Sequence, residues 1–174
     1  MDIIRKALPY PKDFFFPSFL PDKEEILFFD IETTGLSPKS AQIYSIGLLL
    51  FKTSEMEIVQ LFANSLSEEV EVLQGFLEYC KGKTQLISFN GKAFDTPFLE
   101  KSYSQYGLKS PITGLPQLDL FKMIQGNKLS SGVKIVSEGV NKEHFEFKVM
   151  IYKSDVYYVT YEDRLIYNYN TRTR

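Results

Sequence analysis

The 174-residue sequence has only one cysteine and one histidine, and it has no long apolar run. The single cysteine, Cys80, excludes an internal disulfide framework and is typical of a cytoplasmic protein. Because the chain also has only one histidine, a zinc site of the Cys/His type is excluded as well. No apolar run approaches the ~20 residues of a transmembrane helix, and the N-terminus lacks a secretory pattern. We therefore expect a cytoplasmic protein without a membrane partner.

A strong net charge is also absent, because 20 basic and 22 acidic residues leave a formal charge of −2 at pH 7. The charges are nevertheless unevenly distributed. Residues 53–80 contain glutamates but no basic residue, whereas residues 81–134 are rich in lysine. A basic face beside an acidic site would suit a phosphate backbone, but ordinary solvated lysines explain the same pattern. Charge alone does not decide between these two interpretations.

The length fits one domain, and a hydrophobic content of 44% with 15% aromatics is typical of a globular protein. Residues 1–24 are predicted to be an irregular lead-in, because four prolines fall between positions 9 and 21. Residues 25–174 are predicted to form the domain, and completeness at its C-terminus is left open. We expect the Phe-rich segment 14–20 to pack on this domain, while the alternative is an arm that docks a protein partner.

Alternating and helical patterns predict the secondary structure up to residue 107. Strands are expected near 26–31, 42–51 and 56–62 as an antiparallel meander, with a turn at Lys52–Glu55. A helix should follow the capping-box pattern Ser65–Glu68, and a strand at 86–89 should run parallel to the first strand. The helix after Ser65–Glu68 is expected to have its apolar side at Val70, Leu73, Leu77 and Cys80 and to end at Gly82. A second helix is expected from Asp95–Pro97 to Gly107, with an apolar side at Phe98, Leu99, Tyr103 and Tyr106.

The pattern after residue 107 is less distinct. Residues 118–124 are typical of a short strand that continues into a helix. From Phe145 the residues alternate, and Lys153–Asp155 is predicted to turn a hairpin. A helix over 156–170 is an alternative that the periodicity does not exclude.

Acidic residues follow two apolar runs. Asp30 and Glu32 come at the end of a predicted strand, and Asp95 follows the run at 86–89. Two carboxylates that are two residues apart on a strand point to the same side. Burying them is unfavourable, because unpaired charges resist desolvation and repel each other. A divalent cation offsets that cost, so three acids at two strand ends indicate a Mg²⁺ or Mn²⁺ site that acts on phosphate.

These motifs resemble the DEDD superfamily of 3′–5′ exonucleases, and most closely its YprB-type subfamily. The segment Asp-Ile-Glu-Thr-Thr-Gly-Leu at 30–36 is similar to the first exonuclease motif, and Phe-Asn-Gly-Lys-Ala-Phe-Asp at 89–95 is similar to the second. Leu118-Asp119-Leu120 resembles the Asp-Leu segment that usually follows. The resemblance implies an α/β, ribonuclease H-like fold, with a mixed sheet of three antiparallel strands and then parallel strands, flanked by helices.

The resemblance also implies roles for individual residues. Asp30 would bridge two metal ions, Mg²⁺ or Mn²⁺, while Glu32 would hold one ion and Asp95 the other. Backbone amides of Thr33, Thr34, Gly35 and Leu36 would grip the terminal nucleotide, with Leu36 against its base. Contacts to a single-stranded 3′ end are implied for Asn90, Lys92 and Phe94.

Each of these residues also has a purely structural interpretation. Asp95 would cap the helix that begins near Pro97, and Glu32 would be a surface residue in a turn. Gly35 would supply a positive φ angle. For Asp119, a helix cap or a strand-end acceptor is favoured over a metal ligand.

The family's third motif, a His or Tyr followed four residues later by Asp on the last helix, is incomplete in this sequence. His144 is followed at that spacing by Lys148, and Tyr167 by Thr171. Asp163 could be the motif's aspartate, but the residue four positions before it is Val159 instead of His or Tyr. Neither register is complete, so Asp163 is only a candidate for the fourth metal ligand, and activity depends on how the third motif is completed.

Three functions remain open at this point. The favoured one is a metal-dependent 3′–5′ exonuclease that hydrolyses phosphodiester bonds of DNA or RNA by a two-metal mechanism. The alternative is a catalytically impaired relative that binds nucleic-acid ends or a protein partner. A third is a phosphodiesterase for substrates other than nucleic acids, built on the same fold.

Overall fold

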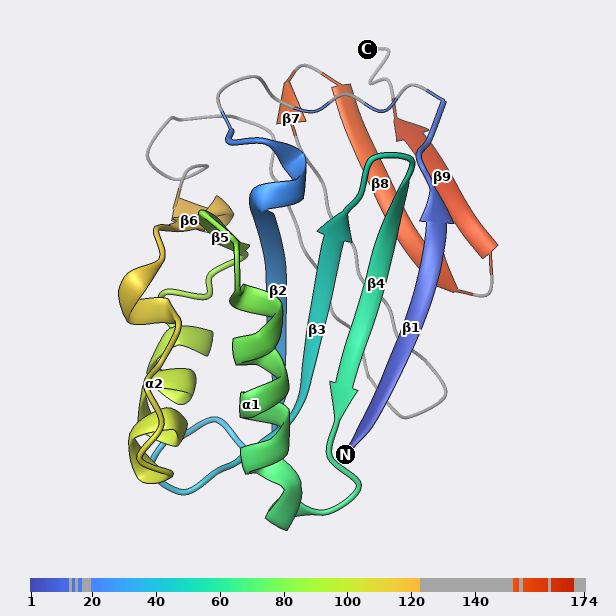
Figure 1. Ribbon diagram of the computed structural model, residues 1–174. Coiled ribbons are helices and arrows are strands. Elements are labelled where there is room, and N and C mark those ends of the chain that lie inside the picture. Colours follow the sequence, from blue (N-terminus) through green and yellow to red (C-terminus); the bar gives the residue numbers. More distant parts are fainter. Residues whose placement is uncertain are drawn as a thin grey trace. The chain divides into compact units, whose positions relative to one another are not determined.

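A mixed sheet of six strands organises the computed structural model (Figure 1). The structure describes residues 1–12, 14, 16 and 20–122, together with the strand residues 152–153, 155–162 and 164–170. Its chain forms two compact units, Met1–Leu118 and Asp119–Arg174. In the described part of the chain, no helix has the length and apolar character that a bilayer crossing requires.

The strand order in the sheet is β1-β4-β3-β2-β5-β6. These strands are β1 (Asp2–Pro9), β2 (Ile26–Thr33), β3 (Ile43–Phe51), β4 (Glu55–Phe62), β5 (Gln85–Ser88) and β6 (Gln117–Asp119). Neighbours β2, β3 and β4 pair antiparallel, and β5 pairs parallel to β2. The backbone turns between β3 and β4 with a hydrogen bond from Lys52 N to Glu55 O. The predicted meander, the parallel fourth strand and the ribonuclease H-like α/β architecture are therefore confirmed.

Strand β1 was not expected, because residues 1–24 were predicted to be irregular. Asp2–Pro9 instead pairs antiparallel with β4 along its whole length, so the prediction was wrong for this stretch. As an edge strand it buries little, and only Leu8 is fully covered. Its proline is the last residue, where no further ladder bond is needed. The assignment of residues 25–174 to one domain stays a prediction.

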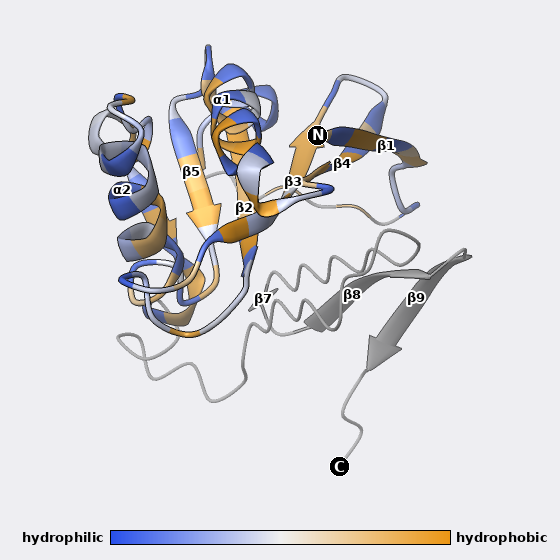
Figure 2. Ribbon diagram, turned by 90° about the horizontal axis from the view of Figure 1, so that it is seen from below, coloured by the Kyte–Doolittle hydropathy of each residue, from blue (hydrophilic) through white to orange (hydrophobic). Residues whose placement is uncertain are grey.

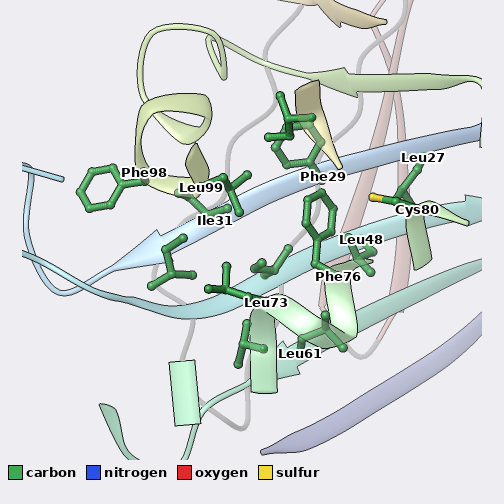
Figure 3. Close-up of a cluster of buried hydrophobic side chains, with 14 of the residues drawn as sticks. Leu27, Phe29, Ile31, Leu48, Leu61, Leu73, Phe76, Cys80, Phe98 and Leu99 are labelled. Carbon is green, nitrogen blue, oxygen red and sulfur yellow. The ribbon is translucent and has the colours of Figure 1, made fainter. Parts of the chain in front are cut away.

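Helices α1 (Glu69–Cys80) and α2 (Asp95–Gln105) lie on one face of the sheet (Figures 1 and 2). In Figure 2 the strands β2 and β5 are largely hydrophobic, while the outer sides of both helices are hydrophilic. Phe76 of α1 packs against Phe29 of β2 (Figure 3). Their ring centroids are 5.4 Å apart. Leu27, Phe29 and Ile31 of β2 all belong to this core. Alternation therefore places Phe28, Asp30 and Glu32 on the opposite face of β2.

The start of α1 differs from the predicted capping box. A short 3₁₀ turn, Leu66–Glu68, precedes the helix, and the Ser65 side chain makes no cap hydrogen bond. The Glu68 carboxylate accepts a hydrogen bond from Asn64 N rather than from Ser65 N. The buried residues of α1 are Glu69, Val72, Leu73, Phe76 and Cys80. The predicted apolar face was therefore right at Leu73 and Cys80, but wrong at Val70 and Leu77, which are not among them. The end at Gly82 is confirmed by that residue's φ of 74°.

Part of the Phe-rich segment covers the opposite face of the sheet. The rings of Phe14 and Phe16 lie 5.7 and 5.4 Å from that of Phe51, which in turn contacts Phe28 at 5.7 Å. The Tyr10 hydroxyl donates to Lys52 O at 2.6 Å. Packing on the domain is thus confirmed for the described members of this segment.

The second unit contains a hairpin where the resemblance implied a last helix. Strands β7 (Tyr152–Lys153), β8 (Asp155–Glu162) and β9 (Arg164–Asn170) form an antiparallel sheet in the order β7-β8-β9. The predicted turn between Lys153 and Asp155 is confirmed. The strand alternative holds for 155–162 and 164–170, and the helical one is wrong there. His144, Lys148, Asp163 and Thr171 lie outside the described residues.

Candidate metal and nucleic-acid site

The first acidic motif lies at the carboxyl end of β2. Asp30 pairs with Gly47 and Glu32 with Ser45 on β3, and the register shifts between Glu32 and Thr33. Both acidic side chains are half-buried. Because they are two residues apart on a regular strand, they share one face, opposite the helices. The predicted placement of two carboxylates side by side at a strand end is therefore present.

Asp95 joins the second motif to the first. Its side chain is only 4% exposed, and its Oδ1 atom accepts a hydrogen bond of 3.1 Å from the backbone N–H of Ile31. The paired stretch of β2 and β5 ends at Phe28 and Ile87. Beyond that point the start of α2 supplies the acceptor for the β2 backbone. The third predicted acid thus bonds to the residue between Asp30 and Glu32.

The helix-cap interpretation of Asp95 is not what the structure shows. Phe94 is the N-cap of α2, it makes no side-chain cap hydrogen bond, and Asp95 is the first helical residue. A carboxylate in the first turn still interacts favourably with the positive end of the helix dipole. The helix therefore contributes to holding a negative charge in this buried position.

The turn before α2 explains the Asn-Gly pair of the second motif. Asn90 has a φ of 58°, a region that asparagine tolerates better than most residues. A Cβ atom on Gly91 would lie 2.3 Å from Ser88 Oγ and 2.6 Å from Ser88 Cβ. Only glycine fits against the end of β5 at that point. Gly91 O then accepts from Thr96 N at 2.8 Å, which fixes the first turn of α2.

Two consecutive hydrogen bonds between side chains link the same turn to β6. The sequence alone did not predict them. Thr96 Oγ1 donates to Gln117 Oε1 at 2.9 Å, and Gln117 Nε2 donates to Ser88 Oγ at 3.0 Å. Gln117 thereby connects the end of β5 with the residue next to Asp95. No pattern in the sequence pointed to Gln117, because the contact joins segments 21 and 29 residues apart.

The loop after β2 is closed at its base by two hydrogen bonds between Thr34 and Gln42. Thr34 N donates to Gln42 O, and Gln42 N donates to Thr34 Oγ1, both at 3.0 Å. The Thr34 amide therefore already has a partner within the chain. Gly35 is not among the described glycines with positive φ, so that interpretation of it was wrong. Leu36 is 88% exposed, an unusual position for a leucine.

The predicted strand contacts near α2 differ in exposure. Asn90 and Lys92 are exposed, whereas Phe94 is half-buried. The Phe94 ring packs on Phe98 at 4.9 Å between centroids. Asn90 and Lys92 are thus placed on the surface beside Asp95, and Phe94 contributes to the core as well.

The donor chemistry at this position fits a hard cation, since it consists of carboxylate oxygens. Among the residues that the structure describes, however, no three acidic, histidine or cysteine side chains are grouped so that they could hold a metal ion. Asp163, the expected fourth ligand, lies outside those residues. Asp119 accepts from Phe121 N at 3.1 Å, which confirms its predicted role as a cap.

Cys80 is part of the core, as expected. The side chain is 5% exposed, and burial raises the pKa of its thiol to about 12. At neutral pH it is therefore a protonated thiol and neither a nucleophile nor a metal ligand.

Comparison with known families identifies the fold from the sequence. A family profile described as the RNase_H superfamily matches residues 27–168. The uncharacterized protein YprB of Bacillus subtilis strain 168 is 28% identical over 106 residues, which cover 60% of this chain and 25% of YprB. A PolC-type DNA polymerase III of Clostridium perfringens strain 13 is 31% identical over 113 residues, covering 51% of this chain and 8% of the polymerase.

Among solved structures, E. coli exonuclease I in complex with a dT13 oligonucleotide matches with a TM-score of 0.46 and 13% identity. The match covers 65% of this chain and 32% of the exonuclease. The chain thus spans about a quarter of YprB and a smaller part of the polymerase. The predicted relationship to the superfamily and to YprB is confirmed.

Proposed function

Because the chain belongs to the ribonuclease H superfamily, we propose that it is a metal-dependent 3′–5′ exonuclease that hydrolyses phosphodiester bonds of DNA or RNA. The observation that carries the proposal is the hydrogen bond from Ile31 N to Asp95 Oδ1. It joins two acidic motifs that are 64 residues apart. The likeness to a PolC-type DNA polymerase supports nucleic acid as the substrate class.

In this proposal Asp30, Glu32 and Asp95 are the protein ligands of two Mg²⁺ or Mn²⁺ ions, with Asp163 as a further ligand. Bound there, such ions would supply activation of the attacking water and stabilisation of the leaving 3′ oxygen. The chain's own part is to hold negative charge at the end of β2. Asp95 does so while anchored to the strand backbone, so its carboxylate has one fixed orientation.

The strand end to be cleaved would lie across the surface residues of both motifs. Exposed Leu36 would stack against the terminal base, and exposed Asn90 and Lys92 would contact the backbone. Backbone amides at Thr33, Gly35 and Leu36 remain candidates for the terminal nucleotide. The Thr34 amide is a weaker candidate, because it bonds to Gln42 O.

The hairpin β8–β9 favours the alternative of a catalytically impaired relative. The third motif requires two side chains four residues apart to act together. Four residues rise ~6 Å along a helix but ~13 Å along a strand. Tyr167 lies within strand β9 and not on the helix that the motif requires, and the sequence has Thr171 instead of an acid at the motif's spacing. An impaired relative would still bind strand ends through the exposed residues.

Digestion of 5′-labelled single-stranded DNA and RNA in Mn²⁺ tests the proposal. We expect a ladder that shortens from the 3′ end and is absent in Asp30→Ala. The matched control is Glu100→Gln, which removes one acidic charge from an exposed position of α2. This variant should produce the ladder at the wild-type rate.

Three outcomes separate the candidate functions. Binding of the oligonucleotides without cleavage, in the presence of Mn²⁺, would establish the impaired relative. Cleavage of bis(p-nitrophenyl) phosphate with no oligonucleotide degraded would favour a phosphodiesterase for other substrates. Cleavage that survives in Asp30→Ala would contradict the proposed site.

A further inference from the structure

Glu69, at the first position of α1, is a buried acid whose two carboxylate oxygens both accept hydrogen bonds. Its side chain is 0% exposed. Oε1 accepts from Ile43 N at 2.9 Å and from Ser102 Oγ at 2.8 Å. Oε2 accepts from Gln42 Nε2 at 3.1 Å and from the Tyr106 hydroxyl at 3.0 Å. Burial and the bond to Glu69 raise the pKa of Tyr106, so its hydroxyl stays a donor at neutral pH.

Gln42 connects this acid to the loop after β2. Its side-chain nitrogen donates to Glu69 and also to Leu66 O at 3.3 Å. Its backbone N and O form the two bonds to Thr34 that close the loop. The position of the loop base therefore depends on a side chain held by a buried carboxylate. The loop in turn presents Leu36, the most exposed large apolar residue described.

We propose that Glu69 and Gln42 form a positioning pair that fixes the Thr34–Gln42 loop and thereby sets the affinity for the end of a nucleic-acid strand. The inference rests on the proposed function, because it assigns Leu36 to the terminal base. Its physical basis is the entropy of the loop. A loop that is already ordered loses less freedom when a base stacks on its leucine, so binding is tighter.

Two conservative variants separate positioning from general stability. Tyr106→Phe removes one donor to Glu69 Oε2, and Gln42→Met removes the other together with the bond to Leu66 O. Only Gln42 stands at the base of the loop, where its backbone bonds to Thr34. A purely structural role of Glu69 predicts similar consequences for both. A positioning role predicts that only Gln42→Met changes the loop. Gln42→Ala provides the same test in case the methionine variant does not fold.

The loop is measured directly through a fluorescent probe. The chain contains no tryptophan, so Leu36→Trp introduces a single indole into the loop. We expect its fluorescence anisotropy to fall when Gln42→Met is added and to remain unchanged when Tyr106→Phe is added. Equal changes in the two double variants, or no change in either, would overturn the inference without reference to any nucleic acid.

The second readout uses the chain with native Leu36 and single-stranded oligonucleotides in Ca²⁺, which is not expected to support cleavage. Gln42→Met should weaken binding about fivefold, and should raise KM in Mn²⁺ with kcat unchanged. Tyr106→Phe should alter neither. Loosening of the loop with unchanged affinity would overturn the inference. If the wild-type chain neither binds nor cleaves any oligonucleotide, the proposed function fails, while the anisotropy still decides whether the pair holds the loop.

Discussion

The two helices of the sheet domain begin in the same way, with a buried carboxylate that reaches a strand. Glu69 opens α1 and accepts a hydrogen bond from Ile43, the first residue of β3. Asp95 opens α2 and accepts one from Ile31 in β2. In each case the acid combines a favourable position at the helix N-terminus with a bond to a strand backbone. The motif ties a helix start to the sheet.

The surroundings of the two acids differ. The four groups that donate to Glu69 are all neutral. They are the side-chain amide of Gln42, the backbone N–H of Ile43 and the hydroxyls of Ser102 and Tyr106. Asp95 instead bonds to the residue that separates two further carboxylates, Asp30 and Glu32. Like charges in one place disfavour ionisation and cost stability unless a cation is bound. Burial of an acid therefore does not by itself mark a functional site, and the proposed site differs from the surroundings of Glu69 in having further acidic residues near it in the sequence.

The largest expected effect that distinguishes the two acids is on cleavage. Asp95→Asn keeps an oxygen that accepts from Ile31 N, but it removes the charge. If Asp95 is a metal ligand, the loss should be about 4 kcal/mol of transition-state stabilisation, or about 1000-fold in kcat/KM. Initial rates on a labelled oligonucleotide measure this. More than a tenth of the wild-type rate would reduce Asp95 to the same structural role as Glu69.

Metal binding should raise the free energy of unfolding through the proposed site at Asp30, and not through Glu69. At a Mn²⁺ concentration 100 times the Kd, the free energy of unfolding should rise by about 2.7 kcal/mol. Asp30→Asn should remove most of that gain. Glu69→Gln should retain all of it, because Glu69 is not part of the metal site. Urea unfolding with and without Mn²⁺ gives both values, and an equal gain in the wild type and Asp30→Asn would contradict the site.

Without metal, substitution of Glu69 should lower the free energy of unfolding more than substitution of Asp95. Glu69→Gln leaves an amide that cannot accept from all four donors, so we expect a loss of about 1–2 kcal/mol. Asp95→Asn retains an oxygen that accepts from Ile31 N, so its loss of stability should be smaller than that of Glu69→Gln. Urea unfolding in EDTA tests this pair. A larger loss for Asp95→Asn would show that its charge stabilises the fold.

Local patterns in the sequence were sufficient for the elements that place the acids. Strands β2, β3 and β4 have apolar runs separated by recognisable turns, and α2 has a proline in its first turn and Gly107 after its end. Asp30 and Glu32 could be found because they stand at the end of such a run, and Asp95 because it lies six residues after Phe89, the last residue of the next run. The hydrogen bond from Ile31 N to Asp95 Oδ1 lies just beyond the stretch in which β2 and β5 pair in parallel.

Tertiary contacts determine what the sequence did not reveal. Nothing local distinguishes Glu69 from Glu68, its neighbour, yet only Glu69 meets donors from three other segments. Strand β1 was missed because an edge strand buries one side chain and so lacks an apolar alternation. For residues 155–170 helix and strand patterns were equally compatible, and pairing of β8 with β9 decided the outcome.

A last expected effect concerns Cys80, at the opposite end of α1 from Glu69. Burial raises the pKa of its thiol from 9.0 to about 12. Only the thiolate reacts with iodoacetamide, so at pH 8 the folded chain should react about 1000-fold more slowly than an exposed thiol. Since the folded pKa exceeds the unfolded one, this group's contribution to stability is complete below pH 9 and is lost as the pH rises toward 12.

Cys80 labelling thereby reports how firmly α1 is held. If the thiol reacts through transient opening, its rate follows the equilibrium between closed and open forms. A loss of about 1–2 kcal/mol in Glu69→Gln should then accelerate labelling about 5- to 30-fold. Asp95→Asn, on the other helix, should leave the rate close to that of the wild type. Equal acceleration in both variants would mean that the two acids stabilise a single cooperative unit, and the distinction between a structural and a functional carboxylate would then depend on cleavage and metal binding alone.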